Sequence, residues 1–251
     1  MRILVIPDVH LKPWMFDKAD EVDKNKYDKI VCLGDIADDW GQQLNQDLYE
    51  KTFERVLQFD KDHPDMFWCL GNHDYSYLWG FPETGFSTLV ISLVANYILK
   101  LEKQAGKRLG IVHDVDGILF SHAGLTDYFV QHYFHNSIKD DPKDTRKQVL
   151  KAINYAWKDK SHAEKLWQNE SPIWFRPPHY SMEHTFLFGQ TENDFKQGFI
   201  TQVAGHTPDR TPYNYHGLLM LDTFSTYRCG DAIGDQKFVI VNTEKQNWEY
   251  A

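Results

Sequence analysis

The stretch Ile30-Val31-Cys32-Leu33-Gly34-Asp35-Ile36-Ala37-Asp38 joins a short apolar run to a polar turn that carries carboxylates. An apolar run of this length is typical of a buried strand, and the turn should follow the strand's carboxyl end. The pattern recurs at Asp8-Val9-His10, Gly71-Asn72-His73-Asp74, Ser121-His122-Ala123-Gly124 and Gly205-His206-Thr207, after runs over residues 3–6, 66–70, 118–120 and 202–204. We therefore expect carboxylates, imidazoles and an amide to gather along one edge of a sheet.

Length and composition are those of a globular protein. The chain has 251 residues, of which 42% are hydrophobic and 25% charged. This length suffices for one large α/β domain or two small ones. The apolar stretch over residues 3–7 is too short for a signal sequence or a membrane span. We expect a cytoplasmic protein that does not enter a membrane.

Charge and cysteine content argue against two further classes. A net charge of −9 is unfavourable for a broad nucleic-acid-binding surface. It is compatible with a phosphorylated substrate, because bound divalent cations would reverse the local field. The three cysteines, Cys32, Cys69 and Cys229, form no CxxC pair and cannot provide a disulfide framework. None of these properties indicates an oligomeric state.

The first part of the chain alternates between strand and helix patterns. Strands are expected at residues 2–6, 29–33 and 66–70, and helical segments at 17–25 and 44–61. In the second helical segment Phe53, Val56, Leu57 and Asp60 fall at helical spacing. This alternation predicts βαβ units and an α/β fold that begins with a largely parallel sheet.

The pattern is less regular after residue 85. Leu89, Leu93, Tyr97 and Leu101 recur every four residues and predict a helix over residues 88–105. Residues 110–116 and 117–121 then predict a β-hairpin in which Asp116-Gly117 forms the turn.

Residues 125–198 are polar and aromatic, with helical patterns at 147–157 and 163–167 and a break at Arg176-Pro177-Pro178. We interpret this segment as an insertion over the motif edge, within a single domain of residues 1–251. Strand patterns return at 198–204, 218–222, 227–229 and 237–241, and they predict a second sheet.

The side chains of the motifs are suited to binding metal ions. A carboxylate such as Asp35 can bridge two cations, and the oxygen of Asn72 can ligate without adding charge. Mixed nitrogen and oxygen ligands favour manganese, iron, zinc or nickel over calcium or magnesium. Two ions about 3.5–4 Å apart could activate a bridging water and hold a phosphoryl oxygen. Each motif by itself is also common turn chemistry, and the other histidines are interpreted as ordinary surface or core residues.

Taken in order, the motifs DxH, GDxxD, GNHD, HAG and GHT resemble the calcineurin-like metallophosphoesterase superfamily. The resemblance implies a four-layer αββα sandwich of two mixed sheets with a dinuclear site at the strand ends. It implies that Asp8, His10 and Asp35 hold one metal, and that Asp35, Asn72, His122 and His206 hold a second. His73 would be the general acid, oriented by Asp38. We expect two divalent or trivalent ions, manganese before iron, zinc or nickel.

Within the superfamily, Gly205-His206-Thr207-Pro208 and Ser121-His122-Ala123-Gly124 resemble the bacterial and phage serine/threonine protein phosphatases and the symmetrical dinucleoside tetraphosphate hydrolases. Ile173-Trp174-Phe175-Arg176 is similar to their Trp-x-Arg element, which implies that Arg176 binds substrate phosphate. The branch usually has an arginine after the catalytic aspartate, but this chain has Asp39. The substitution should weaken the binding of a monoester dianion.

These observations predict a metal-dependent phosphoesterase acting on a phosphomonoester of the phosphoprotein or nucleotide type, by attack of a hydroxide that bridges the two ions. An alternative is a dinucleoside polyphosphate hydrolase or a phosphodiesterase, in which Trp157, Trp167 or Trp174 stacks on a base. A non-catalytic scaffold of the same fold is a further alternative, disfavoured because every predicted ligand position is filled.

Overall fold

The structure, a computed structural model, describes residues 1–166, 172–174 and 186–251. Its first sheet has the order β11-β10-β1-β2-β3-β4. The parallel strands are β1 (Arg2–Ile6), β2 (Lys29–Cys32), β3 (Phe67–Cys69) and β4 (Leu109–Gly110), and the antiparallel ones are β10 (Val239–Asn242) and β11 (Asn247–Tyr250). The expected parallel start of the sheet is confirmed.

The second sheet has the order β5-β6-β7-β9-β8. Its strands are β5 (Val112–Val115), β6 (Ile118–Ser121), β7 (Gln202–Ala204), β8 (Tyr213–Tyr215) and β9 (Leu218–Met220). The three inner strands are parallel and the outer two are antiparallel. The predicted hairpin is present: Asp116 and Gly117 have φ of +51° and +88°, as a two-residue type I′ turn requires.

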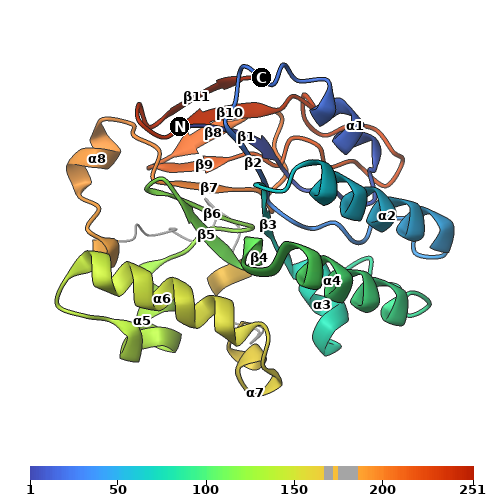
Figure 1. The fold of residues 1–251 in the computed structure, drawn as a ribbon, viewed down its shortest axis with the longest axis horizontal. Coiled ribbons are helices and arrows are strands. Elements are labelled where there is room, and N and C mark those ends of the chain that lie inside the picture. Colours follow the sequence, from blue (N-terminus) through green and yellow to red (C-terminus); the bar gives the residue numbers. More distant parts are fainter. Residues whose placement is uncertain (167–171, 175–185) are drawn as a thin grey trace.

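Helices flank the two sheets (Figure 1). The helices before residue 106 are α1 (Trp14–Asp20), α2 (Gln46–Asp62), α3 (Asn72–Trp79) and α4 (Ile91–Ala105). The later ones are α5 (Asp127–Phe134), α6 (Pro142–Ala156), α7 (Lys160–Ala163) and α8 (Glu192–Lys196). Asn154 of α6 accepts hydrogen bonds from the backbone N–H groups of Ile111 and Val112 and so holds α6 against β5.

Short 3₁₀ turns connect several of these elements: η1 (Gly106–Arg108), η2 (His135–Ser137), η3 (Glu164–Leu166), η4 (Pro172–Trp174) and η5 (Phe186–Phe188). One of them, η4, reaches the site described below.

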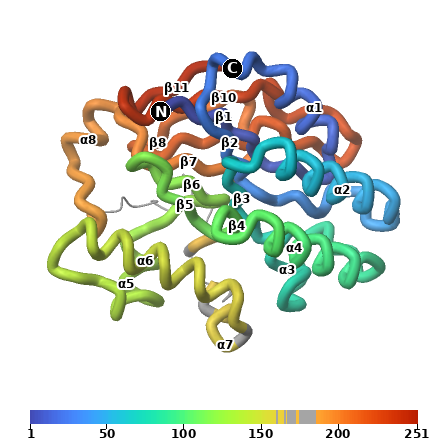
Figure 2. The backbone as a smooth tube through the Cα atoms, viewed as in Figure 1, coloured from blue at the N-terminus to red at the C-terminus, as the bar shows by residue number. Residues whose placement is uncertain are grey.

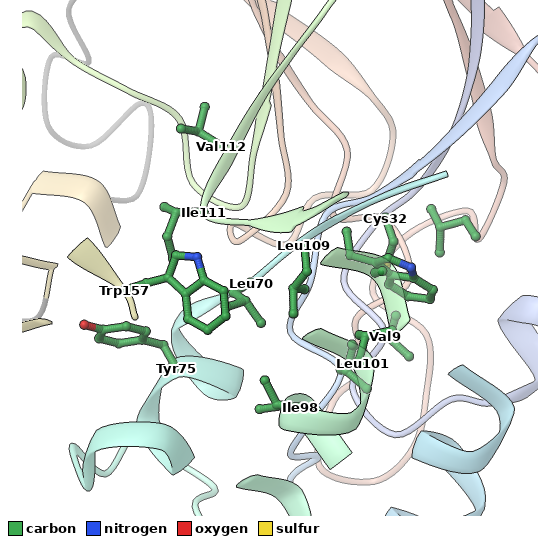
Figure 3. Close-up of a cluster of buried hydrophobic side chains, with 14 of the residues drawn as sticks. Val9, Cys32, Leu70, Tyr75, Ile98, Leu101, Leu109, Ile111, Val112 and Trp157 are labelled. Atoms are coloured by element: carbon green, nitrogen blue, oxygen red, sulfur yellow. The ribbon is translucent and has the colours of Figure 1, made fainter. Parts of the chain in front are cut away.

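Two apolar clusters organise the layers. One lies between the sheets and includes Val5 and Val31 of the first sheet with Phe120 and Val203 of the second. The other joins the helices to the sheets, and Figure 3 shows a part of it in which Ile98 and Leu101 of α4 lie near Leu109 of β4. Successive side chains of a strand point to opposite faces of its sheet, so one strand can contribute to both clusters. The result is the expected fold of two mixed sheets.

Several element boundaries differ from the predictions. The first helix is Trp14–Asp20 rather than residues 17–25, because Met15, Phe16 and Ala19 form its buried face. The helix expected over 88–105 begins at Ile91, and Leu89 precedes it with 56% of its surface exposed. The helical pattern at 163–167 corresponds to the end of α7 and to η3, and Trp167 lies outside the described residues.

The carboxyl-terminal strands also differ from the predictions. Residues 227–229 form an exposed turn rather than a strand, closed by a hydrogen bond from the Gly230 N–H to the Tyr227 carbonyl. The strand expected at 237–241 is β10, and it belongs to the first sheet, where it pairs with β1. The Thr243 N–H donates to the carbonyl of Met1, so the two ends of the chain lie close together (Figure 2). In the described parts of the chain, no helix is both long and apolar enough to span a membrane.

Candidate active site

The five predicted motifs meet at one edge of the two sheets. Asp8, Asp35 and Asn72 follow β1, β2 and β3, whereas His122 and His206 follow β6 and β7. Potential ligand atoms of Asp8, His10 and Asp35 lie within 4.8 Å of one another, and those of Asp35, His122 and His206 form a second such set. All these side chains are buried. Asp35 belongs to both sets, which is the arrangement that a bridging carboxylate requires.

The second set converges on one imidazole nitrogen. Nε2 of His122 lies 3.2 Å from Oδ2 of Asp35, 3.0 Å from Oδ1 of Asn72 and 2.9 Å from Nδ1 of His206. In the first set, Nε2 of His10 lies 3.6 Å from Oδ2 of Asp35. All six predicted ligand side chains are therefore close to the shared carboxylate or to its immediate partners.

Backbone carbonyls orient the three imidazoles. Nδ1 of His10 lies 2.8 Å from the carbonyl oxygen of Asp38, and Nδ1 of His122 lies 3.1 Å from that of Leu33. Nε2 of His206 lies 2.8 Å from the carbonyl oxygen of Trp174, in η4. A carbonyl only accepts hydrogen bonds, so the facing nitrogen donates, and in the neutral ring, the form that binds a metal, the other nitrogen has a lone pair. In each ring the nitrogen with the lone pair faces the ligand sets.

Two motif glycines let the backbone approach the carboxylates. A Cβ atom at Gly71 would lie 2.0 Å from Oδ1 of Asp35, and one at Gly205 would lie 1.8 Å from Oδ1 of Asp8. These distances are shorter than any non-bonded contact, so a side chain at either position would displace a carboxylate. The glycines of GNHD and GHT are thus required by the site itself.

Several site residues adopt the left-handed backbone region, with φ of +41° at His10, +46° at Asp35 and +66° at His206. Residues other than glycine rarely occupy this region, and when they do they cluster at functional sites. The turns after the strands are therefore held in place by the surrounding contacts rather than by local preference.

His73 and Asp38 form a buried pair beside the ligand sets. Nδ1 of His73 lies 3.0 Å from Oδ2 of Asp38, and the His73 backbone N–H donates to Oδ1 of Asp35 at 3.0 Å. Burial works against a charge on His73, yet Asp35 and the hydrogen-bonded Asp38 raise its pKa to about 9. The hydroxyls of Tyr49 and Tyr77 donate to Oδ1 of Asp38 at 2.7 and 2.5 Å. Asp38 is thereby fixed with its second oxygen toward His73.

The electrostatics of the site favour cations. Burial and the neighbouring Asp222 raise the pKa of Asp8 well above its ordinary value. Burial lowers the pKa of His122, but the carboxylates of Asp35 and Asp8 outweigh it and raise that pKa to about 9. The buried carboxylates concentrate negative charge, which bound divalent ions would balance. The donor set of nitrogen and oxygen, without sulfur, fits the metals expected from the sequence.

Other residues at the site were not predicted from the sequence. Asp74, the last residue of GNHD, is fully buried and accepts hydrogen bonds from the backbone N–H groups of Ile36, Ala37 and Gly71. It therefore joins the two loops that carry Asp35 and Asn72. Asp222 follows β9 at the same sheet edge, after the apolar run over residues 218–221, which is the signal that could have indicated it. Lys12 and Trp40, which also contact the site loops, carried no such signal.

The structure describes only some of the residues that were predicted to bind phosphate or to stack on a base. Arg176 and Trp167 lie outside the described residues. Trp157 is only 2% exposed and belongs to the apolar core, so it cannot stack on a base. Trp174 is half-buried, and its indole N–H donates to the carbonyl of Leu166. Its backbone carbonyl contacts His206, so the insertion supports the site through this turn.

Comparisons with known proteins agree with this geometry. Residues 1–210 match the calcineurin-like phosphoesterase family. No significant match to a curated protein is found. The cold-active protein-tyrosine phosphatase of a psychrophilic Shewanella species has a similar structure, with 16% identity, a TM-score of 0.51, and coverage of 99% of this chain and 80% of that one.

A point mutant of cold-active protein tyrosine phosphatase gives 15% identity and a TM-score of 0.54, over 99% of this chain and 80% of that one. A protein serine/threonine phosphatase from Saccharomyces cerevisiae, similar to human phosphatase PP5, gives 15% identity and a TM-score of 0.54, over 100% and 79%. At these identities the likeness is one of fold. The family match over most of the chain, together with the clustered ligand side chains, shows that this protein belongs to the calcineurin-like phosphoesterases and is a metal-dependent hydrolase of phosphoester bonds.

Proposed function

We propose that the protein hydrolyses phosphomonoesters at a dinuclear metal centre. The first ion would be held by Asp8, His10 and Asp35, and the second by Asp35, Asn72, His122 and His206. The observation that carries the proposal is the position of Asp35 in both sets of potential ligands. Two bound ions would supply an activated water and a clamp for the phosphoryl oxygens.

His73 is the group best placed to donate a proton to the leaving oxygen. Its Nδ1 faces Asp38, so the proton for the substrate would come from Nε2. The raised pKa keeps the ring protonated at neutral pH. Asp38 does not reach the substrate in this scheme. It orients the imidazole and stabilises its charge, and the two tyrosine hydroxyls hold it in place.

Three finer expectations belong to the same proposal. Manganese is the metal that the ligand set favours first, and the cytoplasm is the expected location. Of the three similar structures described above, two bear the name of a protein tyrosine phosphatase and one that of a serine/threonine phosphatase. We infer that this protein also acts on phosphorylated side chains or similar monoesters. Burial of Trp157 removes one support for the dinucleoside polyphosphate alternative.

The proposal is tested with p-nitrophenyl phosphate and bis(p-nitrophenyl) phosphate after loading with Mn²⁺. We expect hydrolysis of the monoester, two manganese ions per chain, and a loss of about 10²-fold or more in kcat for His73→Asn, with the metal content unchanged. His132→Asn, at an exposed histidine of α5, is the matched control and should retain activity. Failure to hydrolyse the monoester, or loss of metal from His73→Asn, would contradict the proposal.

A further inference from the structure

The loop after Asp38 carries an acidic and an aromatic residue, Asp39 and Trp40, on one side of the site. Asp39 stands where the resemblance to the serine/threonine phosphatase branch implies an arginine. Its Oδ2 lies 3.7 Å from Nζ of Lys12, which is only 6% exposed and also donates to the carbonyl oxygen of His10 at 3.1 Å. Lys12 therefore ties the loop after β1 to the loop after β2. The pair is formally neutral, so its lysine does not serve as a free cation for phosphate.

The next residue, Trp40, lies against both histidines of this side of the site. The centroid of its ring is 5.3 Å from that of His10 and 5.7 Å from that of His73. The rings of His10 and His73 are 5.2 Å apart and nearly perpendicular. All three are therefore in mutual contact, and Trp40 is the one that remains partly exposed, whereas both histidines are buried.

The indole ring is also available to a ligand. Its N–H donates no hydrogen bond to any of the described residues, and Gly85 lies beside it. A Cβ atom at Gly85 would be 3.9 Å from the indole nitrogen, which is ordinary van der Waals contact, so the glycine leaves room for one methyl group beside this edge of the ring. A half-buried aromatic ring whose donor has no partner among the described residues, beside a buried histidine of the site, is typical of a surface that binds ligand.

The position of Trp40 determines what it would contact. In the proposed reaction, which this inference presupposes, a water oxygen bonds to phosphorus and the bond from phosphorus to the leaving oxygen breaks. The proton of His73 passes to that oxygen, and a proton of the water restores His73. The group attached to the leaving oxygen must then lie next to His73, within reach of the Trp40 ring.

We propose that Trp40 is a specificity-determining residue, and that it selects monoesters whose leaving group has an aromatic ring at the leaving oxygen or one carbon away from it, as in phosphotyrosine. An aryl group bonded directly to the leaving oxygen is close enough to pack on the indole. The short side chain of phosphoserine is not. On this side of the site the exposed part of the Trp40 ring lies next in sequence to the neutral Lys12–Asp39 pair.

The first test needs no variant. Benzyl phosphate and cyclohexylmethyl phosphate have leaving groups of similar basicity and size and differ in aromaticity. The manganese-loaded protein should show a kcat/KM for benzyl phosphate about fivefold or more above that for cyclohexylmethyl phosphate, as expected for a ring-on-ring contact. Equal values would overturn the proposal.

The second test uses two peptides of identical sequence, one with phosphotyrosine and one with phosphoserine. For Trp40→Leu, which keeps an apolar side chain without a ring, the ratio of the two kcat/KM values should fall about five- to tenfold. Trp40→Phe should keep the ratio within about twofold, because a ring remains. Melting temperature and metal content show that both variants are folded and loaded. A ratio that does not change in Trp40→Leu, or that changes equally in Trp40→Phe, would show a merely structural role.

The outcomes separate this inference from the proposed function. If the wild-type protein hydrolyses neither peptide nor p-nitrophenyl phosphate, the monoesterase function itself is wrong, and the role of Trp40 with it. If it hydrolyses them and the ratio of the two kcat/KM values is the same in the wild type and in Trp40→Leu, only the specificity assignment is wrong.

Discussion

The carboxylate of Asp8 accepts hydrogen bonds from the backbone N–H of His206 at both of its oxygens, with distances of 3.1 and 2.9 Å. The two residues are separated by 198 positions and follow strands of different sheets. The contact therefore fixes the loop after β1 to the loop after β7. It is possible only because Gly205 has no side chain.

Gly205→Ala should disable the metal site. The added methyl group would lie 1.8 Å from Oδ1 of Asp8, so the carboxylate or the loop must move. We expect metal affinity to fall by about tenfold or more, as it does when residues that orient a ligand are disturbed. Isothermal titration with Mn²⁺ measures the change. Gly110→Ala is the control, since its methyl group would crowd Asn154, away from the ligands, and should lower the melting temperature without loss of metal. Unchanged affinity in Gly205→Ala would contradict the assignment of Asp8 as a ligand.

Asp38→Asn should reduce turnover while leaving the metals bound. The neutral amide of the variant lacks the negative charge that stabilises a protonated His73. The hydroxyls of Tyr49 and Tyr77 would still lie next to the side chain at position 38. We expect kcat to fall by about 10²-fold. Steady-state kinetics and metal analysis measure both quantities. Tyr49→Phe removes one of the two donors to the same oxygen and should cost only a few-fold in kcat. Near-normal turnover by Asp38→Asn would refute the role of the pair.

Arg108→Met should destabilise the fold at a distance from the site. Asp60 is 1% exposed, and Arg108 contacts both of its oxygens, at 2.5 and 3.2 Å. Removing the arginine leaves a buried carboxylate without its charged partner, which costs about 3–5 kcal/mol. Urea unfolding measures the loss, and adding Asp60→Asn should recover a large part of it. Arg55→Met, at a more exposed ion pair, should cost less than about 1 kcal/mol. Equal losses in the two single variants would show that burial of Asp60 is not the cause.

His113 should make stability depend on pH. Burial lowers the pKa of His113 to about 4, and its Nε2 lies 3.0 Å from the carbonyl oxygen of Trp68. The unfolded chain binds a proton at this residue below about pH 6.5, whereas the folded protein does so only near pH 4. The free energy of unfolding should therefore fall as the pH drops from 6.5 to 4, by up to about 3 kcal/mol.

The comparison that isolates this effect is His113→Gln, whose amide can donate to the same carbonyl without titrating. Unfolding curves of both proteins at several pH values give the difference, in which the titration of all other groups cancels. Parallel pH profiles would rule out His113 as the source.

The ligand positions were predictable because each rests on a local pattern combined with one topological rule. An apolar run identifies a strand, and the carboxyl ends of parallel strands meet at one edge. The rule brings Asp8, Asp35 and Asn72 together, because β1, β2 and β3 belong to one sheet. His122 and His206 follow strands of the second sheet, so their place near Asp35 was implied by the family resemblance. The membership of β10 in the first sheet could not be inferred, because its residues would suit an inner strand of either sheet.

Paired polar residues of the interior were harder to predict. Asp60 falls on the apolar face of its helix, and nothing near it in sequence explains why a carboxylate belongs there. Its partner, Arg108, is 48 residues away. Trp40 was missed for a similar reason, since a tryptophan in a polar loop gives no periodic signal and acquires meaning only from the histidines that it contacts.

The insertion of β10 between β11 and β1 has a consequence for how the site is assembled. Strand β1 carries the loop of Asp8 and His10, yet one of its two neighbours in the sheet is made only near the end of the chain. During synthesis on the ribosome, one edge of β1 stays unpaired until residues 239–242 have emerged. Pairings of such long sequence separation form slowly. We expect the ligand loop that is first in the sequence to be among the last to become ordered.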